Sequence, residues 1–306
     1  MHTASAVGGF EARCDRTKAM PRSRRDVLAV VVSALALSVF GFACHGHHEH
    51  EDPRLAALIV PTLPLVHDGD GVFFVGNSFF GGPNRPLPEQ VAALGRALSP
   101  PVRLEVGADI VFGNTPLSGF LAHPATRQAL ASRKYKVFVL QGEELEPVDH
   151  KLAFHQAVRD FNREIVAAGG RTVLFMTWEF RWRRFIRELA TSYDEIGHEL
   201  GIPVIPIGLI FADAEDQPTG LGGAFWLTAD DLHQNLPGSL VNGYATFALL
   251  TGIDPRGLPS VGQDGLHDRV MRVHLADLAW ARVRPRLRLP PEPPTTRKTA
   301  TEEVAR

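Results

Sequence analysis

The stretch VFFVGNS, residues 72–78, is a short apolar run that breaks into a glycine turn and ends at Ser78. Consecutive apolar residues bounded by a turn are typical of a buried strand in a parallel sheet. A strand that ends in such a turn can present the next hydroxyl group at the mouth of the sheet. We therefore interpret Ser78 as a candidate nucleophile at a strand end.

Other segments share this apolar character and have the length of buried strands. With the first, they predict strands at residues 71–75, 103–108, 136–141, 172–177 and 203–207. Amphipathic stretches alternate with them and predict helices at 88–98, 124–132, 151–168, 182–200, 237–250 and 268–283. A repeated strand–helix order with short connections predicts an α/β fold, a doubly wound parallel sheet of five strands.

A second motif, DDLH at residues 230–233, has the spacing of an acid–histidine pair. One turn of chain lets the Asp230 carboxylate hold one imidazole nitrogen of His233 while the other nitrogen faces a nucleophile. Each residue also has a structural alternative: Ser78 as a turn residue, His233 as a helix cap and Asp230 as a solvated loop charge. The joint pattern favours a serine nucleophile with a His–Asp pair.

Ligands of such sheets bind beyond the carboxyl ends of the strands, so the loops that follow the strands are the places to search. Besides Ser78, those loops carry Gly113, Asn114, Gln141 and Trp178. The 230–233 loop precedes the helix predicted at 237–250, so His233 can reach the same edge. We expect these segments to converge there.

On these residues the chain resembles the SGNH hydrolases, also called GDSL-like esterases and lipases, over residues 70–284. FFVGNS at 73–78 resembles the family's first block, and Asp230-x-x-His233 resembles its last. The resemblance implies a flavodoxin-like three-layer α/β/α sandwich and an esterase that forms an acyl-enzyme. It implies that Ser78 is the nucleophile, His233 the general base and Asp230 its orienting carboxylate, with no metal or organic cofactor.

Other features resemble a subgroup of bacterial SGNH-like domains of unassigned function. They are VLQ at 139–141, FMTW at 175–178 and the run from 233 to 252. Asn77 is a candidate to line the pocket in such a site. Trp178 is a second candidate, and core packing explains it about as well.

The resemblance also implies donors to the oxyanion of the reaction. The Ser78 N–H is one candidate, and the family's second-block glycine corresponds to Gly113, with Asn114 as the alternative. The third block has a Gly-x-Asn arrangement, but here Gly142 is followed by two glutamates, and a carboxylate cannot donate a hydrogen bond. The side-chain amide of Gln141 is the candidate substitute.

The N-terminus predicts export. SRRDVL at 23–28 leads into an uncharged stretch at 27–44 and resembles a twin-arginine leader, with Met1 or Met20 as the start. The segment 1–44 is then a cleaved signal, a signal whose Cys44 becomes a lipidated residue, or an uncleaved membrane anchor. Each outcome places the domain in the cell envelope or outside the cell, membrane-anchored or secreted.

Two further segments flank the domain. Residues 45–69 are a linker and lead-in whose HGHHEH tract at 45–50 suits zinc, copper or nickel by composition, although a flexible polar linker is favoured. Residues 285–306 are rich in proline and charge, which predicts a disordered tail. Because the two cysteines are Cys14 and Cys44, we expect no thiol in the domain.

Composition limits the possible partners. The 306-residue chain is 44% hydrophobic, so it can bury one sizeable core. Its formal net charge is −2. The basic cluster at 181–187 has the pattern of a solvated helix face, so we expect no nucleic-acid partner. A small-molecule or polysaccharide ester is the expected substrate. The alternative is an inactive SGNH-like protein that binds a glycan or an acyl group.

Overall fold

Five parallel strands form the central sheet, in the order β2-β1-β3-β4-β5. Their bounds are β1 Gly71–Gly76, β2 Glu105–Ile110, β3 Tyr135–Leu140, β4 Arg171–Phe175 and β5 Val204–Ile205. The structure is a computed structural model, and it describes residues 61–216, 227–259, 261, 269–287 and 289. The predicted doubly wound sheet of five parallel strands is confirmed.

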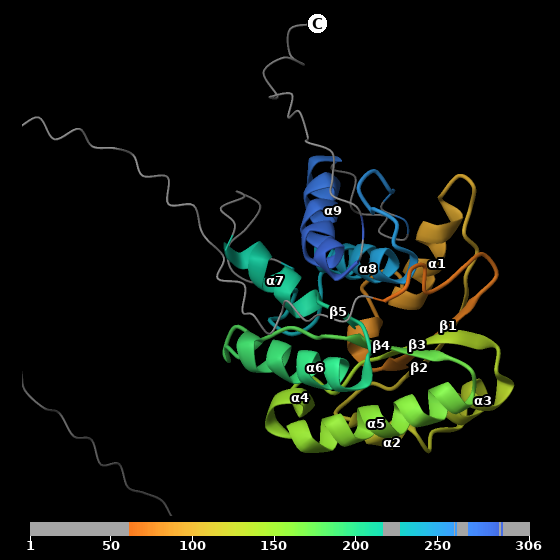
Figure 1. Cartoon of the computed structure of the whole chain (residues 1–306). Coiled ribbons are helices and arrows are strands. Elements are labelled where there is room, and N and C mark those ends of the chain that lie inside the picture. Colours follow the sequence, from red (N-terminus) through yellow and green to blue (C-terminus); the bar gives the residue numbers. More distant parts are fainter. Residues whose placement is uncertain (1–60, 217–226, 260, 262–268, 288, 290–306) are drawn as a thin grey trace, which may run out of the picture. The chain divides into compact units, whose positions relative to one another are not determined.

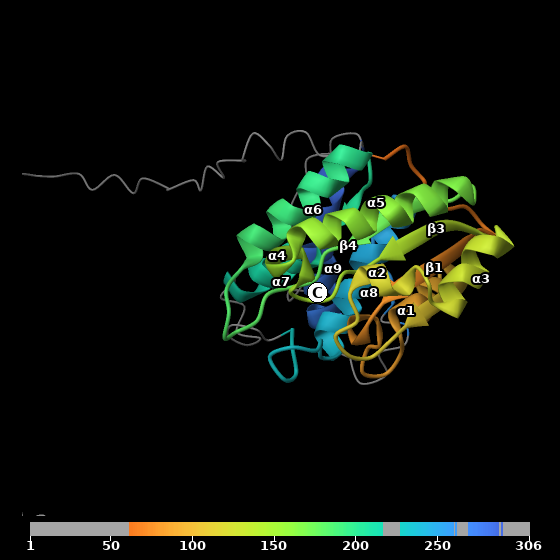
Figure 2. The same cartoon turned by 90° about the horizontal axis from the view of Figure 1, so that it is seen from below.

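Helices cover both faces of the sheet (Figures 1 and 2). One face carries α1 (Leu87–Arg96), α7 (Ile207–Asp216), α8 (Leu236–Thr251) and α9 (Arg269–Val283). The other face carries α2 (Leu117–Phe120), α3 (Pro124–Ser132), α4 (Glu146–Asp149), α5 (Lys151–Ala167) and α6 (Ile186–Leu200). Short 3-10 turns, η2 (Ser78–Phe80) and η3 (Arg284–Arg286), complete the described elements. The architecture is the three-layer α/β/α sandwich that the sequence resemblance implied.

Strand β1 lies in the interior of the sheet, and its apolar composition suits that position. All six of its residues are buried, because β2 and β3 flank it and helices cover both faces. The register pairs Gly76 with Ile110 of β2 and Val75 with Leu140 of β3. The chain that leaves β1 therefore emerges beside the chain that leaves β3, where the strand order changes direction. Such a switch point is where sheets of this kind bind ligands.

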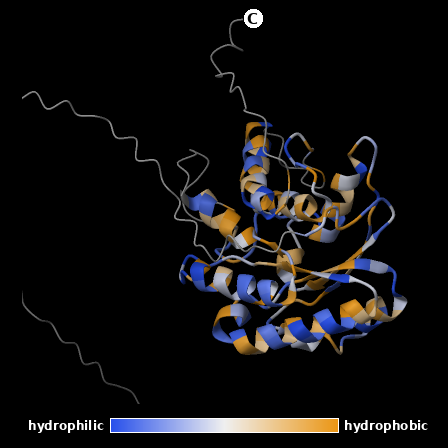
Figure 3. Ribbon diagram, viewed as in Figure 1, coloured by the Kyte–Doolittle hydropathy of each residue, from blue (hydrophilic) through white to orange (hydrophobic). Residues whose placement is uncertain are grey.

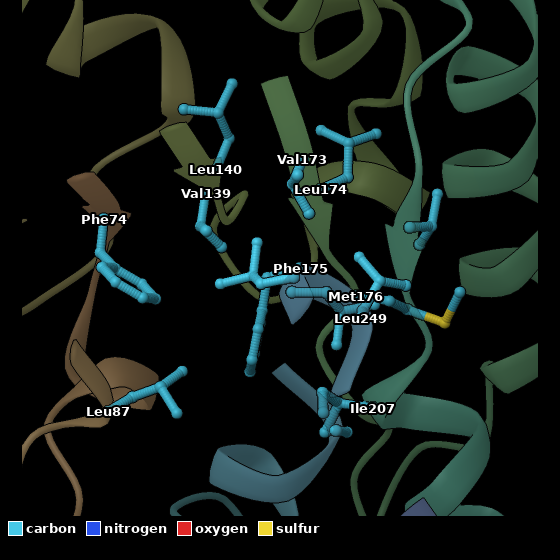
Figure 4. Close-up of a cluster of buried hydrophobic side chains, with 14 of the residues drawn as sticks. Phe74, Leu87, Val139, Leu140, Val173, Leu174, Phe175, Met176, Ile207 and Leu249 are labelled. Carbon is cyan, nitrogen blue, oxygen red and sulfur yellow. The ribbon is translucent and has the colours of Figure 1, made fainter. Parts of the chain in front are cut away.

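The hydrophobic core lies on both sides of the sheet. Figure 3 shows hydrophobic residues along the strands, while α5 changes between hydrophobic and hydrophilic residues along its length. Figure 4 shows Phe74 of β1, Val139 of β3 and Phe175 of β4 together with Leu249 of α8 and Ile207 of α7. All five side chains are fully buried, and each large one contributes about 1.5–3 kcal/mol. The strands that carry the site loops are thus fixed by packing.

Helix starts and ends follow local chemistry. Helix α3 begins at Pro124, as predicted, because proline has no N–H group to leave unpaired in a first turn. Helices α6 and α8 end at Gly201 and Gly252, whose φ values of 70° and 74° lie in the left-handed region that favours glycine.

Two predictions about this part of the fold were wrong. Helix α6 begins at Ile186 and not at residue 182, because the Glu179 carboxylate accepts hydrogen bonds from the N–H groups of Phe185 (2.7 Å) and Ile186 (2.8 Å). Strand β5 is only two residues long, and the chain turns directly into α7 at Ile207. The predicted strand at 203–207 therefore gave too many residues to the sheet.

The flanking segments lie largely outside the described residues. These include the predicted leader at 1–44, its Cys44, the His-rich tract and most of the proline-rich tail. Of the helices that the structure describes, none has both the length and the apolar character needed to cross a membrane.

Candidate active site

The nucleophile candidate Ser78 lies in a tight turn at the carboxyl end of β1. Asn77 caps this turn, because its side-chain oxygen accepts a hydrogen bond of 3.1 Å from the N–H of Phe79. The rings of Phe79 and Phe80 are fully buried and anchor the turn in the core. At Gly76 a Cβ atom would lie 2.6 Å from Oε1 of Gln141, so the close approach of β1 to the β3 loop requires glycine. The turn thus has little freedom to move.

A chain of hydrogen bonds joins the three residues that the sequence analysis assigned to the site. Ser78 Oγ lies 3.0 Å from Nε2 of His233, and Nδ1 of His233 lies 2.8 Å from Oδ2 of Asp230. A ring nitrogen that faces a carboxylate carries the proton, which leaves Nε2 to accept from the serine hydroxyl. Residues far apart in the sequence therefore meet in the order serine, imidazole, carboxylate.

The loop that carries His233 is organised by Asp230. Its Oδ1 accepts hydrogen bonds from the N–H groups of Leu232 (3.1 Å) and His233 (2.6 Å). Partial burial raises the pKa of Asp230, but these bonds and the bond from the His233 ring outweigh it and hold that pKa below its ordinary value. Asp231 has a φ of 64° and pairs with Arg181 at 3.3 Å. Asp230 therefore stays ionised and fixes the ring of His233.

Trp178 is a buried residue that contacts both the Ser78 turn and the His233 loop. It is 1% exposed, its ring stacks on Phe79 at 4.2 Å between centroids, and its Nε1 donates a 2.8 Å hydrogen bond to the carbonyl of Leu232. The ring of His233 meets the same Phe79 edge-on at 5.9 Å. Of the two alternatives for Trp178, a pocket wall or core packing, its burial supports core packing.

No protein-family model matches the chain, and no curated protein matches it either. Among solved structures, LAE5, an alpha/beta hydrolase from the metagenome of Lake Arreo, matches with a TM-score of 0.51 and 12% identity over 62% of this chain and 98% of its own. Axe2, an acetylxylan esterase from Geobacillus stearothermophilus, matches with a TM-score of 0.50 and 12% identity over 61% of this chain and 96% of its own.

A protein from Slackia heliotrinireducens that is provisionally described as an SGNH hydrolase also matches. It is 21% identical over 57% of this chain and 96% of its own, with a TM-score of 0.47. This chain has an SGNH-like fold. At these identities the likeness concerns the fold alone, and hydrolases that include an esterase share it.

The backbone candidates for the oxyanion hole lie in two separate turns. Gly113 and Asn114 lie on the exposed loop between β2 and α2, and Gly113 has a φ of 107°. The N–H of Ser78 is the first of the η2 turn, a position without a carbonyl partner inside the turn. These backbone groups remain the candidates for the oxyanion hole.

Gln141 does not act as the substitute donor that the sequence analysis expected. Its Nε2 donates to Oδ1 of Asn77 at 2.7 Å and to the carbonyl of Gly142 at 3.1 Å, so both amide protons are used. Its Oε1 accepts from the N–H of Asn77 at 3.2 Å. The side chain is 1% exposed. Gln141 therefore fastens the β1 turn to β3, and Asn77, which is also buried, belongs to this structural link instead of a pocket wall.

Glu144 is a residue of the site that the sequence analysis considered only as a missing donor. It stands two residues after Gly142, where the family's third block has asparagine, and it is 8% exposed. Its Oε1 accepts a 2.7 Å hydrogen bond from Nδ2 of Asn77. Burial raises its pKa to about 7, with a further contribution from the neighbouring Glu143 carboxylate. The sequence feature that could have identified Glu144 as a site residue is its position two residues after Gly142, in the third block.

The other two glutamates of this loop have structural partners. Glu143 Oε2 accepts from the N–H groups of Leu145 (3.1 Å) and Glu146 (2.9 Å), and Glu146 Oε2 accepts from the N–H of Leu117 at 2.9 Å. Within the described part of the chain, no group of three or more His, Cys, Asp or Glu side chains is arranged to hold a metal ion. The arrangement is suited to acid–base chemistry on a serine hydroxyl.

Proposed function

We propose that the protein is a serine esterase that hydrolyses a carboxylic ester through an acyl-enzyme. The observation that carries this proposal is the 3.0 Å separation of Ser78 Oγ and His233 Nε2. An ionised Asp230 behind the ring adds the third member of the arrangement. A fold shared with hydrolases, one of them an acetylxylan esterase, supports the same reaction class.

In the first half of the reaction, Ser78 Oγ attacks the carbonyl carbon of the ester while His233 Nε2 takes the hydroxyl proton. The carbonyl oxygen becomes an oxyanion, and Asp230 stabilises the imidazolium that has formed. When the tetrahedral intermediate collapses, the bond to the alcohol oxygen breaks and His233 returns its proton to that oxygen. The acyl group is left on Ser78.

In the second half, a water molecule replaces the alcohol. His233 takes a proton from the water as its oxygen attacks the acyl carbon, and then delivers that proton to Ser78 Oγ as the acyl–serine bond breaks. The products are a carboxylic acid and the restored serine. The N–H of Ser78, with Gly113 or Asn114, is the proposed donor set for the oxyanion, and the loss of one donor costs on the order of 10²- to 10³-fold in rate.

The test uses the purified full-length protein and p-nitrophenyl acetate. We expect the wild type to release p-nitrophenol with turnover and Ser78→Ala to lose that activity. Ser118→Ala, an exposed serine on α2, is the matched control and keeps it. Equal hydrolysis by wild type and Ser78→Ala would rule out Ser78 as the nucleophile.

We also propose that the enzyme acts outside the cytoplasm, on an ester of a polysaccharide or of a small molecule such as a lipid. The leader-like segment at 1–44 supports this location. Fractionation of cells that express the intact chain or Cys44→Ser tests the proposal: a lipid anchor at Cys44 predicts that only the intact chain is found with membranes, whereas a spanning anchor predicts both. Finding both chains in the cytoplasm contradicts export.

One observation favours a second function, a binding protein without catalysis. A carboxyl group at Glu144 replaces the amide donor of the family's third block, and a negative charge there opposes an oxyanion. A folded wild-type protein that turns over no ester and whose Ser78 does not react with an acylating reagent would favour this binding function for a glycan or acyl ligand.

A further inference from the structure

The carboxyl group of Glu144 is connected to the nucleophile turn by a single side chain. Oε1 of Glu144 accepts from Nδ2 of Asn77 at 2.7 Å, and the other end of the same amide, Oδ1, accepts from the N–H of Phe79 at 3.1 Å. Ser78 lies between Asn77 and Phe79. A change in the charge of Glu144 therefore acts on the Asn77 side chain, which shapes the turn around Ser78.

The surroundings of Glu144 disfavour a negative charge. The side chain is 8% exposed, and the Glu143 carboxylate lies against it from the same loop. Glu146, at the start of α4, adds a third carboxyl group to the same loop. Tyr193 of α6 faces the loop from the other side, where its hydroxyl accepts from the N–H of Gly142 at 3.4 Å, and burial raises its pKa, so it remains neutral.

A protonated Glu144 satisfies this environment better than a carboxylate does. Its carbonyl oxygen accepts from Asn77, and its hydroxyl donates to the Glu143 carboxylate, whereas ionisation places two carboxylates side by side in a buried position. Glu143 is already held by the N–H groups of Leu145 and Glu146, so it is the partner that keeps the charge.

We propose that Glu144 is a proton-linked positioning residue: its neutral acid form supports the esterase reaction, and its ionisation slows the reaction by placing a negative charge against the Asn77–Ser78 turn. This inference rests on the proposed function. The charge acts on the step in which an oxyanion develops on the substrate bound to Ser78, because a nearby carboxylate raises the energy of that anion. The proton on Glu144 thus offsets the departure from the family's asparagine. The pKa of about 7 places the transition near neutral pH.

The pH dependence of kcat/KM reports the proton on Glu144. His233 takes the serine proton in the first step of the reaction. Ionisation of Glu144 then lowers activity on the alkaline side, and we expect the wild type to fall about tenfold between pH 7 and pH 9, which corresponds to about 1.4 kcal/mol.

Two substitutions change the alkaline fall in different ways. In Glu144→Gln the side chain keeps an oxygen for Asn77 and an N–H donor for Glu143 but cannot ionise, so the alkaline fall should disappear. In Glu143→Gln the like charge beside Glu144 is removed, so Glu144 ionises at lower pH and the alkaline fall should move to lower pH. Glu188→Gln, an exposed glutamate in the first turn of α6, is the control and should match the wild type.

A second measurement separates this inference from the proposed function. Thermal unfolding of wild type and Glu144→Gln at several pH values reports the Glu144 proton without any need for activity. The inference is overturned if Glu144→Gln keeps the alkaline fall and shows the same pH dependence of unfolding as the wild type. If no form of the protein hydrolyses p-nitrophenyl acetate but the unfolding curves still differ with pH, the proposed esterase function fails and the protonation of Glu144 stands.

Discussion

The indole ring of Trp178 lies nearly parallel to the ring of Phe79, with the centroids 4.2 Å apart and an interplanar angle of 6°. The same indole donates a hydrogen bond from Nε1 to the carbonyl of Leu232 at 2.8 Å. One buried side chain thus contacts the residue after Ser78 and the residue before His233. It links the turn that carries Ser78 to the loop that carries His233.

Replacement of Trp178 by phenylalanine tests this link. Trp178→Phe keeps an aromatic ring on Phe79 but removes the N–H donor, so the His233 loop loses an anchor. We expect kcat/KM to fall about tenfold, with a loss of about 1 kcal/mol in the free energy of unfolding, the usual value of one hydrogen bond. Steady-state kinetics and chemical denaturation measure the two effects. Unchanged kinetics would show that the loop is positioned without this bond.

Asp230 and Asp231 offer a matched pair of substitutions. Asp230→Asn removes the charge behind His233 and favours the wrong ring tautomer, so kcat should fall on the order of 10²- to 10⁴-fold. Asp231→Asn should remain close to the wild type. It loses only an exposed pair with Arg181, and asparagine tolerates the left-handed φ of 64° at this position. Similar losses in both variants, measured with the same ester, would contradict the assignment of Asp230.

The tight turn at Gly76 predicts a packing effect. In Gly76→Ala the new methyl group would lie 2.6 Å from Oε1 of Gln141 and 2.9 Å from the ring of Phe80, so the turn or the β3 loop must shift. We expect a destabilisation of about 1–3 kcal/mol, as for other overpacked cores, together with a loss of activity. Denaturation of Gly119→Ala, where the nearest atom is a Thr115 methyl carbon at 3.2 Å, provides a milder comparison.

The raised pKa of Glu144 predicts how stability changes with pH. The folded chain holds this proton up to a pH of about 7, whereas the group in an unfolded chain releases it near 4.5. The stabilisation that the proton provides is therefore complete below pH 4.5 and is lost as the pH rises to about 7. Glu144→Gln removes this dependence, so its melting temperature relative to the wild type should increase from pH 5 to pH 8. An offset that stays constant over this range would contradict the raised pKa.

Much of the fold could be predicted because its signals are local. The apolar runs identified each strand that the structure describes, and proline at the start of α3 and glycine after α6 and α8 marked helix ends. Helix α7 was missed because its apolar start continues the apolar run of β5, and the two patterns merge. The late start of α6 depends on the Glu179 cap, a contact that forms only when the chain folds back.

The candidate site was predictable in its reacting residues but less so in its supports. Ser78, His233 and Asp230 carry their signal in short motifs, and the structure brings them within hydrogen-bond distance. The roles of Gln141 and Glu144 depend on the register that places β1 beside β3, which no local pattern reveals. For Trp178 the sequence shows a place in a loop, but it does not show the burial that decides between a pocket wall and core packing.

The most direct test of the central claim is covalent labelling of the purified full-length protein with a fluorophosphonate ester, followed by mass spectrometry. The hydrogen-bonded arrangement of Ser78, His233 and Asp230 predicts one added phosphonyl group, located on the peptide that contains Ser78, and no addition in Ser78→Ala. A folded wild-type protein that gains no mass, or that is labelled equally after Ser78→Ala, would contradict the account.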